Sequence, residues 1–171
     1  VKAVAHAMAM AEQGAAIIDI GGESTRPGAK AVDAQQEMDR VLPVIEAVVA
    51  NIDIPVSIDT SKPEVMRAAV AAGVGLVNDV TALQQEGALQ AVSECKVPVC
   101  LMHMLGEPRT MQENPQYDNV VTDVIAFLKL RIQAAVDAGI NKANIIIDPG
   151  FGFGKSLAHN MALLNNLDKF N

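Results

Sequence analysis

The stretch PVSIDTSKPEVMRAAVAAGVGLVNDV, residues 55–80, decides the fold, because it holds two apolar strands with a helix between them. The β-branched runs at 55–61 and 76–80 have the composition of buried strands, and residues 63–72 repeat apolar positions at helical spacing until Gly73 ends the helix. Two strands joined by a helix in this way are predicted to be parallel neighbours in one sheet.

The same alternation continues on both sides of this unit. Further helices are predicted at about 2–14, 33–50, 86–95, 118–138 and 157–169, and further strands at 15–22, 97–104 and 144–148. Five parallel strands alternating with helices indicate an α/β fold, and no strand is followed by the G-x-G-x-x-G of an open dinucleotide-binding sheet. We therefore predict one domain, 1–171, that is an incomplete (β/α)8 TIM barrel lacking the first strand and the last two.

Composition excludes several functional classes. A net charge of −7 and 3% aromatic residues argue against a nucleic-acid surface, which needs basic side chains or stacking platforms. No apolar run approaches the ~20 residues of a membrane span, so no membrane contact is expected. Cys95 and Cys100 lack the spacing of metal ligands and are predicted to be reduced thiols, which indicates the cytoplasm.

Polar residues recur near the carboxyl ends of the predicted strands. In a (β/α) barrel these ends meet at one face, where the loops build the active site. The residues concerned are Asp19, Asp59, Asn78 with Asp79, His103 and Asp148.

Capping of the next helix is the alternative role for such residues. It suffices for Ser61 and stays open for Asp79. Asp59 and Asp148 are separated from the next helix by further polar or glycine residues, so ligand contact is the favoured role for them. A flat heterocycle with adjacent N–H donors would suit such carboxylates.

The segment IIIDPGFGFGKS, 145–156, raises the question of a nucleotide-binding loop. A Walker-type loop needs Gly, four residues, then Gly-Lys-Ser or Gly-Lys-Thr, and Pro149 stands where the first glycine is required. Proline has no N–H to donate to a phosphate. Lys155 is therefore not predicted to bind a nucleotide.

Four ordered motifs resemble the bacterial dihydropteroate synthase family. They are IDIGGESTRPGA (18–29), SIDTSKPEVMRAAVAAGVGLVNDV (57–80), PVCLMHM (98–104) and DPGFGFGK (148–155). The resemblance implies a TIM-barrel transferase of folate biosynthesis, which joins 6-hydroxymethyl-7,8-dihydropterin pyrophosphate to p-aminobenzoate with loss of pyrophosphate. It also implies Mg²⁺ in the family, but the strand that supplies its ligand is not in this sequence, and we predict no metal ligand here. A homodimer is expected for the complete enzyme.

The resemblance also assigns site residues. Asp59, Asn78 and Asp148 would hydrogen-bond the pterin, with Met102 packed nearby, and Gly150, Gly152 and Gly154 would let their loop run close beneath the ring. Thr25, Arg26 and Pro27 would lie on a mobile loop near the pyrophosphate and aminobenzoate, and Phe153 would contact the aminobenzoate. The catalytic residues would be Asp59, Asp148 and Arg26.

Two other functions stay open, a noncatalytic pterin-binding fragment and a pterin-dependent methyltransferase on the same barrel. Three nearby residues receive simpler interpretations. His103 is expected to be structural, Glu23 is expected to fix its loop by accepting backbone N–H groups, and Lys62 is expected to cap a helix or to be solvated.

Overall fold

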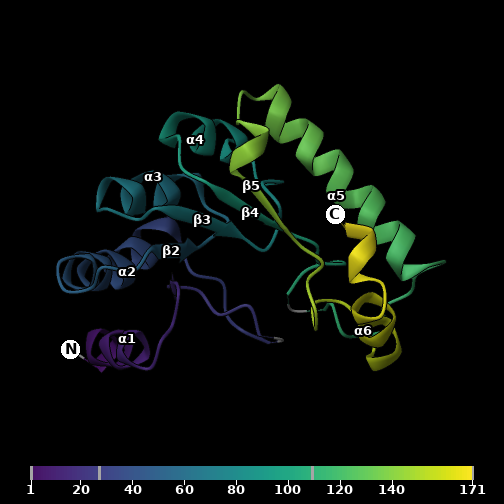
Figure 1. Cartoon of the computed structure of the whole chain (residues 1–171), viewed down its shortest axis with the longest axis horizontal. Helices are drawn as coiled ribbons and strands as arrows, with labels where there is room; N and C mark the ends of the chain where they lie inside the picture. The colour runs from purple at the N-terminus through teal and green to yellow at the C-terminus, as the bar shows by residue number, and fades with distance from the viewer. Residues whose placement is uncertain (1, 27, 109, 171) are drawn as a thin grey trace.

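The computed structural model describes residues 2–26, 28–108 and 110–170, and a single parallel sheet organises them (Figure 1). The strands follow one another in the order β1-β2-β3-β4-β5, each pairing in parallel with the next. Their bounds are β1 Ile18–Gly21, β2 Val56–Asp59, β3 Leu76–Asp79, β4 Val99–Met102 and β5 Ile145–Asp148. The predicted alternation and the parallel α/β fold are confirmed.

The helices lie in an arc on one side of this sheet (Figure 1). They are α1 Lys2–Glu12, α2 Ala34–Val49, α3 Pro63–Ala71, α4 Ala88–Cys95, α5 Val120–Asp137 and α6 Leu157–Leu164, with short 3₁₀ helices η1 Lys142–Asn144 and η2 Leu167–Phe170. The helix predicted at 157–169 is thus wrong in its second half. Asn165 caps α6, and Asn166 donates its side-chain N–H to the carbonyl of Ala162, which favours an end there.

Glycine sets the connections from helix to strand. Gly14, Gly73 and Gly139 have φ of +93°, +105° and +92°, a region that side chains disfavour. Each lies two residues after the end of a helix and turns the chain back toward the sheet.

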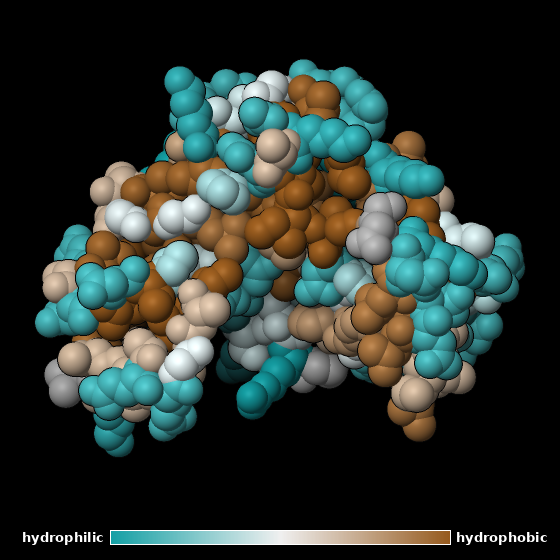
Figure 2. All heavy atoms as spheres, viewed as in Figure 1, coloured by the Kyte–Doolittle hydropathy of each residue, from teal (hydrophilic) through white to brown (hydrophobic). Residues whose placement is uncertain are grey.

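The main core lies between the helices and the outer face of the sheet. Ile58, Val77, Val99 and Leu101 point to that side and are fully buried against the helices. The opposite face is open, and Ile146 of β5 is 49% exposed there. Figure 2 shows apolar side chains exposed over the middle of the molecule, above a hollow.

No helix in the described parts of the chain is long and apolar enough to cross a bilayer.

Candidate functional site

The strand register determines which polar side chains share the open face of the sheet. Paired residues on adjacent strands point to the same side, and so do residues two apart on one strand. Asp59 pairs with Asn78, Asn78 pairs with Cys100, and Cys100 is two residues from Met102, which pairs with Asp148. Asp59, Asn78, Met102 and Asp148 therefore all point to the open face, at the carboxyl ends of their strands, as predicted.

Asp59 is the most electrostatically perturbed of these groups. Burial disfavours its ionised form, and the carboxylates of Asp19, Asp79 and other nearby acids repel it, so its pKa rises from 3.8 to about 7. It does not cap a helix, because the N-cap of α3 is Lys62. This half-buried carboxyl can exchange a proton near neutral pH, or accept hydrogen bonds from a donor-rich ligand.

Asn78 is oriented from below by Asp19. Asp19 lies in the middle of β1 and pairs with Ser57, so it belongs to the layer beneath Asp59 and not to the strand end that the sequence predicted. Its Oδ1 accepts the Ser57 hydroxyl at 2.5 Å, and its Oδ2 accepts an Asn78 amide N–H at 3.1 Å. Because a carboxylate only accepts, the amide nitrogen of Asn78 must face Asp19, which leaves the amide oxygen free to accept from a ligand.

Asp79 points to the opposite face and holds the loop after β3. Its Oδ1 accepts from the backbone and hydroxyl of Thr81, both at 2.8 Å, and its Oδ2 accepts the Leu83 N–H at 2.8 Å. Asp79 therefore fixes the loop after β3 from inside the core, where it is fully buried. Capping of the next helix, which the sequence left open for Asp79, is wrong, because the N-cap of α4 is Gly87.

Asp148 is held by the loop that follows it. Its Oδ1 accepts the Gly150 N–H at 2.7 Å, which fixes the direction of the carboxylate. It is not a helix cap, because α6 begins at its own cap, Ser156, whose hydroxyl accepts the His159 N–H in a capping box.

The glycines after Asp148 are required for a reason that the sequence did not reveal. A Cβ on Gly150 would lie 1.9 Å from the carbonyl oxygen of His103, and one on Gly154 would lie 2.7 Å from that of Leu105. Both glycines have positive φ. The loop thus runs against the loop after β4, and the expectation that the glycines serve only to approach a ligand is incomplete.

Lys155 holds these two loops together from inside. Its buried Nζ lies 3.0 Å from Nδ1 of His103 and donates to the carbonyls of Gly150 at 2.8 Å, Phe153 at 2.9 Å and His103 at 3.2 Å. Burial lowers the pKa of Lys155 to about 8. The lysine is structural, which agrees with the exclusion of a nucleotide loop.

His103 is structural, as predicted. It is buried, and its ring packs edge-on against Phe127 of α5 with centroids 4.9 Å apart. Burial and the positive charge of Lys155 lower its pKa to about 4. The ring is therefore neutral and its Nδ1 is an acceptor, so the three N–H groups of Lys155 are shared among Nδ1 and the three carbonyls.

The other predicted residues lie on loops around the open face. Thr25 and Asp59 both line a cavity of about 450 Å³ formed by the loops after β1 to β4. Arg26 is exposed on the loop after β1, and Pro27 lies outside the described residues. Phe153 is half-buried on the loop after β5, so the structure brings the strand residues together and leaves Arg26 and Phe153 on separate loops.

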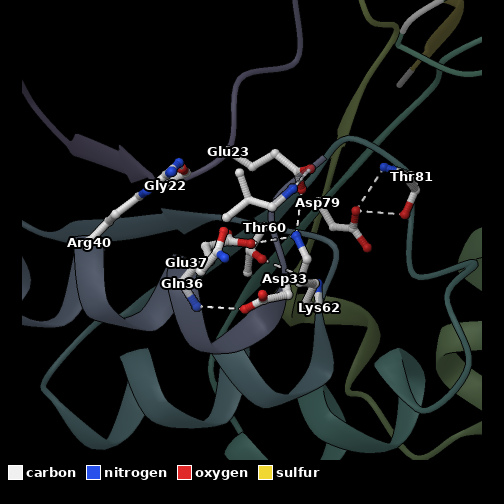
Figure 3. Close-up of polar contacts among 11 residues, drawn as sticks. Gly22, Glu23, Asp33, Gln36, Glu37, Arg40, Thr60, Lys62, Asp79 and Thr81 are labelled. Atoms are coloured by element: carbon white, nitrogen blue, oxygen red, sulfur yellow. Dashed lines mark hydrogen bonds and ion pairs between the residues drawn. The ribbon is translucent and has the colours of Figure 1, made fainter. Parts of the chain in front are cut away.

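A partly buried ion-pair cluster joins the loops after β1 and β2 to α2, and the sequence prediction missed it (Figure 3). Nζ of Lys62 lies 2.5 Å from Oε2 of Glu23 and 2.6 Å from Oε2 of Glu37. Burial alone would lower the pKa of Lys62, but its hydrogen bonds to the two glutamates outweigh burial and raise it. Lys62 is the N-cap residue of α3, so the expectation that it caps this helix is confirmed, although its side chain makes no capping hydrogen bond. The alternative that its charged group is simply solvated is wrong, and Ser61 is not the cap of α3.

One signal could have revealed this cluster. The buried stripe of α2 is Glu37, Val41, Ile45 and Val48, so an acid occupies a position of the apolar stripe. A charge at such a position is costly unless a partner reaches it. Glu23 accepts the Val32 N–H at 2.9 Å, which confirms its predicted role in fixing the loop.

The described residues offer no group of three His, Cys, Asp or Glu side chains able to hold a metal ion. Mg²⁺ stays a prediction drawn from the family.

Comparison with known proteins decides the family. The model of the family described as "Pterin binding enzyme" matches residues 1–171. The chain belongs to the pterin-binding enzyme family.

Relatives within this pterin-binding family are synthases. The chain is 54% identical to the dihydropteroate synthase of Haemophilus influenzae, with 99% of the chain and 62% of the relative covered. Dihydropteroate synthase of Xanthomonas albilineans with 4-aminobenzoic acid is 57% identical with a TM-score of 0.92, over 98% of this chain and 59% of that one. The same organism's enzyme in complex with 7,8-dihydropteroate is 53% identical with a TM-score of 0.87, over 98% and 58%. The chain thus spans about 60% of the length of such relatives.

Proposed function

We propose that the full-length protein carrying this chain is a dihydropteroate synthase. It would join 6-hydroxymethyl-7,8-dihydropterin pyrophosphate to p-aminobenzoate, giving 7,8-dihydropteroate and pyrophosphate. The observation that carries the proposal is the convergence of Asp59, Asn78 and Asp148 on one face of the sheet. The identity of about half to relatives named as this enzyme, one of them bound to the product, supports it.

The three side chains suit the pyrimidine edge of a pterin. Asp148 offers an oriented carboxylate, Asn78 offers an amide oxygen, and Asp59 offers a carboxyl with a pKa near neutrality. An edge with several adjacent N–H donors satisfies such acceptors, whereas an acceptor-rich ligand would be repelled. Met102 lies in register with Asp148 on this face and would pack against the ring.

The proposed reaction needs no covalent intermediate with the protein. The bond between the pterin methylene carbon and the pyrophosphate oxygen breaks, the arylamine nitrogen forms the new bond to that carbon, and the amine loses a proton. The methylene carbon gains positive character as pyrophosphate leaves, and nearby carboxylates such as Asp59 and Asp148 stabilise it. Arg26 would pair with the leaving anion, with Thr25, Pro27 and Phe153 around the second substrate. Catalysis then depends on positioning and electrostatics.

Turnover by the full-length protein tests this proposal. We expect pterin pyrophosphate and p-aminobenzoate to be consumed together with release of pyrophosphate, and we expect Asp59→Ala to abolish the reaction. Pterin binding without turnover would support the alternative of a noncatalytic pterin-binding protein. Transfer of a methyl group to an acceptor, with p-aminobenzoate unused, would support a pterin-dependent methyltransferase.

We further propose that the full-length enzyme acts in the cytoplasm as a homodimer. The two free cysteines fit a reducing compartment. Light scattering of the full-length protein that gives the mass of one chain would contradict the dimer.

A further inference from the structure

The loop that carries Thr25 and Arg26 is closed at its base by Glu23. This residue follows Gly22 directly after β1, and its Oε1 accepts the backbone N–H of Val32 at 2.9 Å. Val32 is buried, so it anchors the far end of the loop in the protein. One side chain thus joins the two ends of the segment 24–31, while Arg26 between them is exposed.

The base of this loop is packed tightly against α2. A Cβ on Gly22 would lie 2.8 Å from Cγ of Glu37, so only glycine allows the helix to approach this closely. Arg40 of the same helix donates to the Gly22 carbonyl at 2.9 Å. The start of the loop is therefore fixed on one side by α2.

Lys62 fixes the base from the other side. It belongs to the short connection between β2 and α3, three residues after Asp59. Its Nζ contacts Glu23 at 2.5 Å and Glu37 at 2.6 Å, and Figure 3 shows it pointing between the two carboxylates. Glu37 is completely buried, its Oε1 has no hydrogen-bond partner, and its Oε2 is paired with Lys62.

We propose that Lys62 is a positioning residue that ties the loop 24–31 to the strand end that carries Asp59. The inference rests on the proposed function and adds a role for a residue outside the set Asp59, Asn78 and Asp148. Lys62 lies three residues after Asp59 in the segment that joins β2 to α3. If Lys62 no longer held Glu23, Thr25 and Arg26 would be displaced relative to the pterin. The pterin contacts themselves would stay intact.

The test uses the full-length protein and the variant Lys62→Met, which keeps the length of the side chain and removes its charge. The change leaves Glu37 buried and unpaired, so the double variant Lys62→Met with Glu37→Gln is measured beside it to separate loop positioning from loss of folding. Lys62→Arg should retain function. The matched control is Arg67→Met on α3, which removes the exposed ion pair between Arg67 and Glu94 of α4.

We expect KM for p-aminobenzoate to rise on the order of tenfold or more, with a lower kcat, because small misplacements of catalytic groups have large effects. Pterin affinity without the second substrate should stay within about twofold of the unmodified protein. Hydrogen exchange at residues 23–32 of the unliganded protein should become faster in Lys62→Met and in the double variant Lys62→Met with Glu37→Gln. It should stay unchanged in Arg67→Met.

Two results would overturn the inference. One is a fall in pterin affinity in the double variant as large as the rise in its KM for p-aminobenzoate, which would indicate a general structural role. The other is unchanged exchange at 23–32. The exchange measurement needs no turnover, so it still judges the role of Lys62 if the protein proves not to be a synthase.

Discussion

Lys155 and His103 form a buried contact, with Nζ 3.0 Å from Nδ1, that joins the loop after β5 to the end of β4. The same Nζ donates to three backbone carbonyls. The loop that follows Asp148 is therefore fixed by one side chain, which makes the carboxylate direction depend on a residue outside the binding face.

Replacement of Lys155 by methionine should destabilise the protein. It would remove the donor that Lys155 offers to the carbonyls of Phe153 and His103, while the Gly150 carbonyl keeps the Phe153 N–H, and we expect a loss of roughly 2–4 kcal/mol in the free energy of unfolding. Denaturant unfolding measures this value. Lys142→Met, at an exposed position, should change it little, and equal effects of the two variants would refute the structural role of Lys155.

His103 should make stability fall in acid. Its pKa in the folded protein is about 4, below the 6.5 of an unperturbed histidine, because of burial and the charge of Lys155. As the pH falls from about 6.5 to about 4, the unfolded chain binds a proton here and the folded protein does not. This contribution amounts to about 3 kcal/mol. His103→Gln should remove it from the pH profile of unfolding, while His6→Gln at an exposed site should not.

Asp59 should make stability fall as the pH rises, whereas His103 makes it fall in acid. Its pKa is raised from 3.8 to about 7, so the stability it contributes is present below about pH 4 and is lost as the pH rises through 7. Asp59→Asn cannot ionise and should be more stable than the unmodified protein at pH 8 by roughly 1–3 kcal/mol, allowing for solvent screening. It should also bind pterin more weakly. Asp53→Asn, at an exposed position, is the control. If Asp59→Asn were less stable than Asp53→Asn at pH 8, the raised pKa of Asp59 would be contradicted.

Asp148→Asn should weaken pterin binding specifically. Its oxygen would keep the Gly150 N–H, so its amide nitrogen would face the ligand in place of an acceptor. The expected loss is roughly 1–3 kcal/mol of binding free energy. Calorimetry with the pterin pyrophosphate checks this, with Asp118→Asn, an exposed position, as control, and an unchanged affinity would count against the role of Asp148.

Local patterns were enough to predict the strands and the binding face. The β-branched runs and the glycines after the helices define the elements, and the two-residue period of a strand places Asn78 on one face and Asp79 on the other. Contacts between distant residues were beyond such reasoning. Lys62 is 39 residues from Glu23 and 25 from Glu37, and no local period connects them.

Asp19 was misplaced for a related reason. A carboxylate inside a β-branched run indicates a strand, but its height in the sheet depends on the pairing with Ser57 of the next strand. That offset between strands is set by packing of the whole sheet. The role of Asp19 in orienting Asn78 therefore became visible only with the register.

The opposite directions of Asn78 and Asp79 make the length of β3 as critical as its residues. One residue inserted before Asn78 would turn the amide toward the helices and bring the carboxylate of Asp79 to the open face. The open face would then gain a negative charge, and Thr81 and Leu83 would lose the acceptor that shapes their loop. Homologous proteins that keep both functions can therefore vary in sequence along this strand, but insertions and deletions must fall outside it.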